Sequence, residues 1–566
     1  MADASCAPCE VSETTPATPP AFFFARGKGT YRVQHDLPRA ARRKLVAALA
    51  AAGHADGVVL LRGGVETTRN DTDHEPVFRQ ESYFQYFFGV AEPDCYGMIE
   101  LPSGRATLFV PRLAPEYAVW MGAIKPPGQF KARYRVDACD YTDRVAEVLA
   151  STVLGSGGEG GSSGGGDGHG KIYVLAGENT DSGLDIAKVL PVSSVADGGV
   201  IPAECVTRVD RAALYEIAAE CRVVKSADEI DLMRYVAWVA SCAHASVMRD
   251  ARPGMMEYQL EALFLFHCAF HGGCRHAAYT SICACGPNSS VLHYGHAGAP
   301  NDRLLEPSDM ALLDMGCEYF CYASDITCSF PVSGDFTPDQ RLVYEAVLDA
   351  QRQILGQMRP GVAWSDMHAL MWRVILTHLR RHGLVVGEVE DMLAANLGQV
   401  FTPHGLGHLI GIDTHDVGGY LSHTPQRSAV KGLDKLRTAR VLAEGMALTV
   451  EPACYFIDAL LDDALADPAR RGFLAADRLE GFRGFGGVRL EDVVVVTVDG
   501  VDNLTLCPRT VVEVEKVMRG GEWPPTTDAA PWLKRRWMVL DKPSGTMVPD
   551  RSVRVETSGF SVDADF

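Results

Sequence analysis

Residues 310–330 read MALLDMGCEYFCYASDITCSF, and this stretch does most to decide the fold. One apolar run ends at Asp314, and a second, β-rich run contains Asp325 eleven residues further on. The segment between them is long enough for a hairpin, so both carboxylates can meet at its open side. A carboxylate inside an apolar strand is costly to bury unless it is paired or binds a cation. The stretch therefore predicts β-strands that bring acidic ligands together.

Three further candidate ligands, one imidazole and two carboxylates, lie in strand-like or glycine-rich contexts. They are His408 in PHGLGHLIG, Glu451 in MALTVEP and Glu491 in GGVRLEDVVVVT. Salt bridges are the alternative explanation for four carboxylates, but these segments offer only Arg489 as a cation. Four carboxylates and one imidazole form a hard, anionic set that suits Mn²⁺ and, less selectively, Co²⁺, Fe²⁺ or Zn²⁺. Such a set can hold two ions about 3.5–4 Å apart and generate a hydroxide nucleophile at neutral pH.

Three histidines fall within twelve residues, at positions 404, 408 and 415. A single histidine here would usually be a satisfied core residue, and the clustering favours a functional site instead. His404 and His408 have the spacing of the two ligands in a zinc-protease helix. That motif also needs a glutamate after its first histidine, and Gly405 stands there. The neighbouring proline and glycines predict a loop rather than a helix.

Net charge limits the class of partner. Lys and Arg total 53 and Asp and Glu total 72 among 566 residues, which gives a formal charge of −19. Nucleic acids and anionic membranes are bound by clustered cations, so neither is expected as the main partner. The composition, 47% hydrophobic and 22% charged, is ordinary for a soluble globular enzyme, and the length favours two domains with appendages.

The sixteen cysteines are spread along the chain, several of them inside strand-like runs. This favours free thiols in a reducing, cytoplasmic setting. The first twenty residues lack a basic start and an apolar run, so no signal peptide is expected. Cys6 and Cys9 have the spacing of a redox or metal pair. With no second pair and a Pro/Thr-rich flank, residues 1–25 are better explained as a disordered tail.

Residues 26–215 are expected to form an α/β N-terminal domain, because strand and helix patterns alternate. The expected elements are helices at 38–53 and 140–152 and strands at 57–64, 103–112 and 171–178. Residues 155–170, GSGGEGGSSGGGDGHG, are mostly glycine and cannot bury a core. A phosphate-binding loop is the alternative, but neither of the usual glycine patterns is present. We interpret the segment as a surface insertion.

Residues 216–518 are expected to form the second domain, followed by an extension at 519–566 that could dock on the body, bind a partner or stay loose. Ser226 and Glu229 have the spacing of a capping box, and Thr337 followed by proline opens another helix. A helix–RPG–helix unit occurs twice, with the RPG tripeptides at 252–254 and 359–361. The repetition suggests two similar halves around a shared centre.

From about residue 78 to 518 the chain resembles the prolidase branch of the metallopeptidases with the pita-bread fold, the class that includes aminopeptidase P and methionine aminopeptidase. The matching segments include FRQESYFQYFFGV, VLHYGHAGAPNDR, PHGLGHLIGIDTHDVGGY, LRTARVL and FRGFGGVRLED. The resemblance implies an α+β fold, with a pita-bread (creatinase/aminopeptidase-like) catalytic domain after a smaller α/β N-terminal domain. It also implies a dinuclear metal-dependent dipeptidase that hydrolyses Xaa-Pro dipeptides through a metal-bridging hydroxide, and a homodimer.

The resemblance also assigns the metal ligands. Its five positions are Asp314, Asp325, His408, Glu451 and Glu491, and they would hold two Mn²⁺ ions per subunit. Asp325 and Glu491 would bridge the pair, Asp314 would bind one ion, and His408 with Glu451 the other. Glu451 would also relay a proton to the leaving proline nitrogen.

The resemblance further implies substrate-binding and supporting residues. His404 and His415 would act in catalysis by donating to the substrate and the tetrahedral intermediate. Arg437, assisted by His293, would clamp the C-terminal carboxylate of the dipeptide. Without the motif match Arg437 would be explained as a surface arginine on a basic stretch.

Four residues complete the set that the resemblance implies. Tyr279 would line the site, although a core aromatic is an equal alternative. Trp120 would reach the partner subunit's site, and a core tryptophan is again the alternative. Arg489 and Thr327 would support the metal-binding carboxylates.

Two alternatives to a dipeptidase stay open. One is an Xaa-Pro aminopeptidase acting on longer peptides, and the other is a non-catalytic binding protein on the same fold. The complete ligand set argues against the binding protein, and Arg437 favours the dipeptidase.

Overall fold

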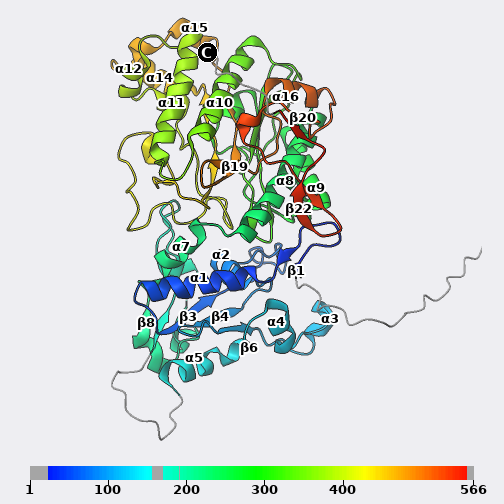
Figure 1. The fold of residues 1–566 in the computed structure, drawn as a ribbon, viewed down its shortest axis with the longest axis vertical. Coiled ribbons are helices and arrows are strands. Elements are labelled where there is room, and N and C mark those ends of the chain that lie inside the picture. The colour runs from blue at the N-terminus through cyan, green and yellow to red at the C-terminus, as the bar shows by residue number, and fades with distance from the viewer. Residues whose placement is uncertain (1–22, 156–169, 190–191, 557–566) are drawn as a thin grey trace, which may run out of the picture.

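The computed structural model describes residues 23–155, 170–189 and 192–556, which form two lobes (Figure 1). The smaller lobe, blue to cyan in Figure 1, precedes α7 (Leu214–Val223), and the larger lobe, green to red, follows it. The domain boundary expected at 215/216 thus falls inside a helix. Three stretches lie outside the described residues: 1–22 of the tail expected at 1–25, 156–169 of the glycine-rich insertion, and the last ten residues.

A six-stranded mixed sheet forms the centre of the small lobe, in the order β6-β5-β4-β3-β7-β8. Its strands are β3 Gly57–Arg62, β4 Tyr96–Glu100, β5 Ala106–Val110, β6 Ala138–Tyr141, β7 Lys171–Tyr173 and β8 Val209–Asp210. The helices of this lobe are α1 Leu37–Ala51, α2 Ser82–Phe88, α3 Tyr117–Met121, α4 Pro127–Tyr134, α5 Val145–Leu154 and α6 Ile186–Val189. Successive residues of β3 pack into two different apolar clusters, because side chains alternate between the faces of a strand.

Three expectations for the small lobe need correction. The helix expected at 140–152 begins only at Val145, because Asp140 and Tyr141 pair with β5 as the end of β6. The expected strands also omit β4, β6 and β8 of the sheet. Phe23 and Phe24, which fall within the expected tail, form the strand β1, which pairs with β2 (Val33–Gln34). The expected strands contain β3, β5 and β7, and the helix expected at 38–53 overlaps α1, which begins one residue earlier, at Leu37.

Two helix pairs organise the larger lobe: α8 Ala227–Asp250 with α9 Glu257–Gly272, and α10 Pro338–Gln357 with α11 Trp364–Arg381. The expected capping box at Ser226 is formed, since its hydroxyl accepts from the Glu229 amide and the Glu229 carboxylate accepts from the Ser226 amide. Thr337 caps α10 in the same way. Both RPG tripeptides lie between the helices of a pair, as the repeated pattern predicted.

Each helix pair precedes antiparallel strands. The first set is the sheet β10-β11-β14 and the second is β15-β18-β19, with β16 paired to β17 and a small sheet β13-β12-β9 beside them. The bounds are β9 His276–Ala277, β10 Ile282–Cys285, β11 Met310–Asp314, β12 Cys317–Tyr319, β13 Tyr322–Ala323, β14 Thr327–Pro331, β15 Ala447–Val450, β16 Ala453–Tyr455, β17 Gly487–Arg489, β18 Asp492–Val496 and β19 Val501–Asn503.

Asp325 does not lie within a strand, which corrects the expected single hairpin. The chain between β11 and β14 leaves their sheet and forms β12 and β13, so residues 324–326 are an irregular link back into β14. The remaining helices are α12 Val389–Ala394, α13 Gly398–Phe401, α14 Asp458–Ala466, α15 Ala476–Glu480 and α16 Val511–Met518.

The extension after residue 518 docks on the body. It forms β20 Thr527–Asp528, β21 Met538–Asp541, β22 Thr546–Pro549 and β23 Arg554–Val555. The buried Arg535 guanidinium lies against the rings of Trp523 and Trp537 and binds Asp528 and Glu513. The turn between β21 and β22 also reaches the first residues described, where the Arg32 amide donates to the Gly545 carbonyl at 2.8 Å. Figure 1 shows β22 beside β1 accordingly.

Candidate metal centre

The predicted acidic ligands occupy corresponding places in the two strand sets. Asp314 ends β11, and Glu451 directly follows β15. Asp325 lies two residues before β14, and Glu491 directly precedes β18. The registers place Asp314 opposite Thr327 and Val450 opposite Asp492, so each antiparallel pair presents two carboxylates at one end.

The five predicted ligands line one cavity of about 840 Å³. Asp325, His408 and Glu491 each offer a ligand atom within 4.8 Å of the others. His408 Nε2 lies 3.3 Å from Asp325 Oδ2 and 3.7 Å from Glu451 Oε1. Its Nδ1 lies 3.1 Å from the Leu409 carbonyl, so this nitrogen donates the hydrogen bond and Nε2 keeps its lone pair toward the carboxylates. That is the tautomer a metal ligand needs.

Electrostatics favour a cation at this point. Burial raises the pKa values of Asp325, Glu451 and Glu491 well above their usual range, and neighbouring carboxylates raise them further. Burial lowers the pKa of His408 to about 4, so its imidazole is neutral at pH 7. Crowded acids and a neutral imidazole gain from a divalent ion that replaces protons, and an oxygen-rich set with one nitrogen suits hard or borderline metals. The residues present therefore fit a metal centre.

Arg489 lines the cavity and connects two of the residues expected around the centre. It donates to Asp314 Oδ2 at 2.6 Å and to Thr327 Oγ1 at 3.1 Å. Thr327 in turn donates to Glu491 Oε2 at 2.7 Å, and Tyr279 donates to Asp314 Oδ1 at 2.6 Å. Tyr279 and Thr327 thus each contact a predicted ligand directly, although Thr327 does not line the cavity.

Sequence reasoning missed Tyr455. Its hydroxyl accepts from Arg489 NH1 at 2.5 Å and lies 3.0 Å from His404 Nε2, so it joins the carboxylate support to the substrate side of the cavity. A signal was present, because residues 451, 453 and 455 alternate along an extended run and therefore share a face.

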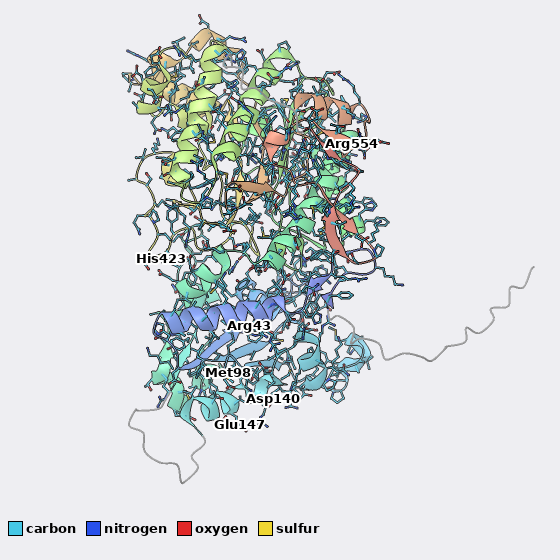
Figure 2. The ribbon with its side chains drawn as sticks, viewed as in Figure 1. Arg43, Met98, Asp140, Glu147, His423 and Arg554 are labelled. Carbon is cyan, nitrogen blue, oxygen red and sulfur yellow. The ribbon has the colours of Figure 1, made fainter. Side chains whose placement is uncertain are left out.

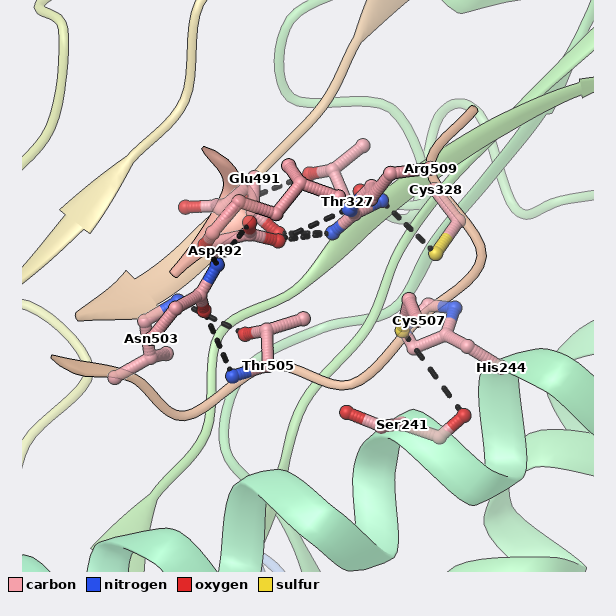
Figure 3. A network of polar contacts seen from close by, with 12 residues as sticks. Ser241, His244, Thr327, Cys328, Glu491, Asp492, Asn503, Thr505, Cys507 and Arg509 are labelled. Atoms are coloured by element: carbon pink, nitrogen blue, oxygen red, sulfur yellow. Dashed lines mark hydrogen bonds and ion pairs between the residues drawn. The ribbon is translucent and has the colours of Figure 1, made fainter. Parts of the chain in front are cut away.

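A second polar network lies behind the centre (Figure 3). Arg509 is fully buried and donates to the backbone carbonyls of Thr327 at 2.8 Å and Glu491 at 2.5 Å. It also pairs with Asp492, which accepts from Asn503 at 2.8 Å. Arg509 therefore fixes the two chain segments that carry Asp325 and Glu491. No short-range pattern in the sequence pointed to it.

The predicted substrate-side residues are gathered in the same cavity, with one exception. His293, His404, His415 and Arg437 all line it. Burial lowers the pKa values of His404 and His415 to about 3, so both rings are neutral at pH 7. Trp120 lies on α3 in the small lobe and is 82% exposed. The alternative of a core tryptophan is therefore wrong, and this chain alone does not bring Trp120 to the cavity.

Comparisons with known proteins show which family the chain belongs to. The family model described as Metallopeptidase family M24 matches residues 231–498, and that of the aminopeptidase P N-terminal domain matches residues 39–158. A human Xaa-Pro dipeptidase is 48% identical over 506 residues, which cover 89% of this chain and 97% of the relative. The chain belongs to metallopeptidase family M24.

Other M24 relatives carry different names. A probable Xaa-Pro aminopeptidase of Phaeosphaeria nodorum is 33% identical, and the match covers 83% of this chain and 93% of the relative. The solved structure of Pseudomonas aeruginosa aminopeptidase PepP is similar with a TM-score of 0.68 at 30% identity, covering 87% of this chain and 99% of that one. These matches confirm the expected fold, a pita-bread domain after a smaller N-terminal domain. Membership of family M24 also implies a divalent metal at the buried Asp/His/Glu group.

Proposed function

We propose that this M24 protein is a prolidase, a hydrolase of Xaa-Pro dipeptides. The observation that carries the proposal is that the acidic metal centre and the guanidinium of Arg437 line one cavity. A dipeptide has its C-terminal carboxylate next to the scissile bond. A dipeptidase therefore needs a cation close to the metal centre to bind this carboxylate. The 48% identity to the human Xaa-Pro dipeptidase supports the same choice over an aminopeptidase.

The centre is proposed to hold two Mn²⁺ ions per subunit, with Co²⁺, Fe²⁺ or Zn²⁺ as substitutes. Asp314, Asp325, His408, Glu451 and Glu491 would hold them. When bound, such ions supply Lewis acidity and make water a nucleophile at neutral pH. Arg489 would keep Asp314 oriented by their 2.6 Å hydrogen bond.

The chain's own residues would bind the dipeptide and move its proton. His415, neutral in the buried cavity, would donate a hydrogen bond to the substrate carbonyl as negative charge develops there. The single N–H of neutral His404 is at Nδ1, 2.8 Å from the Gly405 carbonyl, so His404 would line the substrate site without donating to that carbonyl. Glu451, whose Oε2 lies 3.6 Å from His404 Nδ1, would carry a proton to the leaving nitrogen. Arg437 and His293 would bind the carboxylate. Proline makes the scissile bond a tertiary amide without an N–H, so a site that offers no acceptor there would favour it.

The alternative functions are separated by one experiment, a matrix of metals against substrates. Protein stripped with a chelator and reloaded with Mn²⁺ is expected to cleave Gly-Pro, with lower rates for Co²⁺, Fe²⁺ and Zn²⁺. Removal of the first residue from Gly-Pro-Gly at a comparable kcat/KM would instead support an aminopeptidase. Less than one tightly bound ion per chain, with no activity after reloading, would support the binding protein.

A homodimer is proposed because α3 presents an apolar surface to solvent. Tyr117, Val119, Trp120 and Met121 are all exposed on this five-residue helix. In the proposed dimer Trp120 would reach the cavity of the partner subunit.

Trp120→Ala is therefore expected to raise KM for Gly-Pro about tenfold, as loss of one buried aromatic contact implies. Steady-state kinetics and light scattering check this. If the Trp120→Ala variant is dimeric and its kinetics are unchanged, Trp120 does not contribute to the partner's substrate site.

A cytoplasmic location is also proposed. The cysteines of residues 23–155, 170–189 and 192–556 are all free thiols, which suits a reducing compartment. None of the helices in these ranges combines the length and hydropathy needed to cross a membrane.

A further inference from the structure

The small lobe reaches the edge of the cavity through a short loop after β7. Residues Glu178 and Asp185 form an isolated bridge that closes this loop. Inside it, the Asn179 side-chain oxygen accepts from the amides of Asp181 at 3.0 Å and Ser182 at 2.9 Å. The tip of the loop is thus held in a defined turn, and the Asp181 carboxylate projects from it to the larger lobe.

Asp181 bridges two arginines of the larger lobe. Its Oδ1 lies 2.9 Å from Arg427 NH2, and its Oδ2 lies 3.3 Å from Arg437 NH1. Arg427 is strongly fixed, since it donates to the Leu436 carbonyl at 2.6 Å and stacks 4.3 Å from the centre of the Tyr420 ring. The carboxylate side chain is only 19% exposed.

The bridge lies at the junction of the lobes. His423, labelled in Figure 2, precedes Arg427 in the same connection and pairs with Glu220 of α7 at 3.3 Å. Arg437 lines the cavity and Arg427 does not. Asp181 therefore ties Arg437, which lines the cavity, to a rigid point outside it.

The charges of Asp181, Arg427 and Arg437 decide whether loss of Asp181 weakens or strengthens substrate binding. Two guanidinium groups share one carboxylate, which leaves one positive charge for a ligand. Without Asp181 the two arginines would repel each other. Arg427 has other anchors, so Arg437, which Asp181 holds by a single contact, would swing toward solvent. Removing the Asp181 charge would by itself favour an anionic ligand, but that charge is partly screened. The loss of Arg437 orientation therefore outweighs this gain.

We propose that Asp181 is a positioning residue that sets specificity for a free carboxylate, an inference that rests on the proposed dipeptidase function. By holding Arg437 toward the cavity, it reserves the remaining positive charge for the carboxylate of a dipeptide. A longer peptide places a neutral amide at this point and would have to extend past the loop at 178–185. The small lobe thereby contributes to substrate choice through a single side chain.

The test compares Asp181→Asn with Glu178→Gln, which removes the same charge from the same loop at a side chain without an ion pair among the described residues. Both Mn²⁺-loaded variants and the wild type are assayed on Gly-Pro and on glycyl-prolinamide, which lacks the carboxylate. For Asp181→Asn we expect KM for Gly-Pro to rise about tenfold, with kcat within about twofold. Activity on the amide should change less than about twofold, and Glu178→Gln should match the wild type. Asp181→Glu should recover part of the loss.

Three results would overturn the inference. A lower KM for Gly-Pro in Asp181→Asn would show that Asp181 competes with the substrate for Arg437. Equal losses on both substrates would show a general structural role, and unchanged kinetics would show no role. In each case a wild type active on Gly-Pro keeps the proposed function. A wild type inactive on Gly-Pro, with two ions bound, would reject that function and the inference with it.

Discussion

Asp325→Asn should lower kcat/KM for Gly-Pro by at least about 10³-fold. The substitution keeps the shape but removes a negative charge from the group formed with His408 and Glu491. Charge stabilisation by a metal is worth several kcal/mol, and each 1.36 kcal/mol is tenfold in rate. Mass spectrometry of the metal content and steady-state kinetics measure the effect. Asp499→Asn, at an exposed turn between β18 and β19, is the matched control and should behave as wild type.

The same variant, Asp325→Asn, should increase the thermal stability of the metal-free protein. Burial, and then Asp314, raise the pKa of Asp325 well above its usual range. A carboxyl with a raised folded-state pKa stabilises the fold below its unfolded pKa, and this contribution is lost as pH rises through the folded value. In a chelator at pH 8, Asp325→Asn should therefore melt above the wild type, and the difference should shrink toward pH 4. A lower melting temperature at pH 8 would mean that Asp325 serves the fold and not a metal.

Arg437→Ala should raise KM for Gly-Pro about 10²-fold with a smaller change in kcat. A charge-assisted hydrogen bond to a carboxylate contributes about 1.5–3 kcal/mol, and each 1.4 kcal/mol is tenfold in affinity. Arg437→Lys should recover part of the loss, because a point charge remains without the planar fork. Activity on glycyl-prolinamide should fall far less, since that substrate has no carboxylate to bind.

Lys435 provides the contrast for this prediction. It lines the same cavity but is largely exposed and pairs with Asp434 at 3.3 Å. Lys435→Ala should change KM less than about threefold, as expected for an exposed charge. A larger effect for Lys435→Ala than for Arg437→Ala would mean that the clamp has been assigned to the wrong cation.

Local patterns predicted the features whose causes are local. The capping boxes at Ser226 and Thr337 and the repeated helix pairs follow from side chains within four residues of each other. The five predicted ligands line one cavity. The four carboxylates among them could be predicted because burying a carboxylate in an apolar run is costly unless it is paired or binds a cation. Asp325 was placed in a strand in error, because its β-rich neighbours gave no sign that the chain leaves one sheet to form another.

The residues that sequence reasoning missed act over long separations. Arg509 reaches Thr327, Tyr455 reaches Arg489, and Asp181 reaches Arg437 across two lobes. Arg509 and Asp181 are ordinary in their own segments, and only the packing of distant segments gives them partners. Tyr455 alternates with Glu451, but its partner Arg489 also comes from a different segment. The placement of the final extension on the body has the same cause, since the sequence left docking, a partner and a loose tail equally open.

The contact between the end of the chain and its beginning has a consequence for biosynthesis. Arg32 donates to the Pro543 carbonyl at 3.0 Å, across 511 positions of sequence. At a ribosomal rate of about 5–20 residues per second, roughly half a minute to two minutes separate the synthesis of these partners. The first paired strands must therefore wait, without this neighbour, until the segment around residue 543 has been synthesised. Chains that stall early would display this uncovered edge to chaperones and proteases.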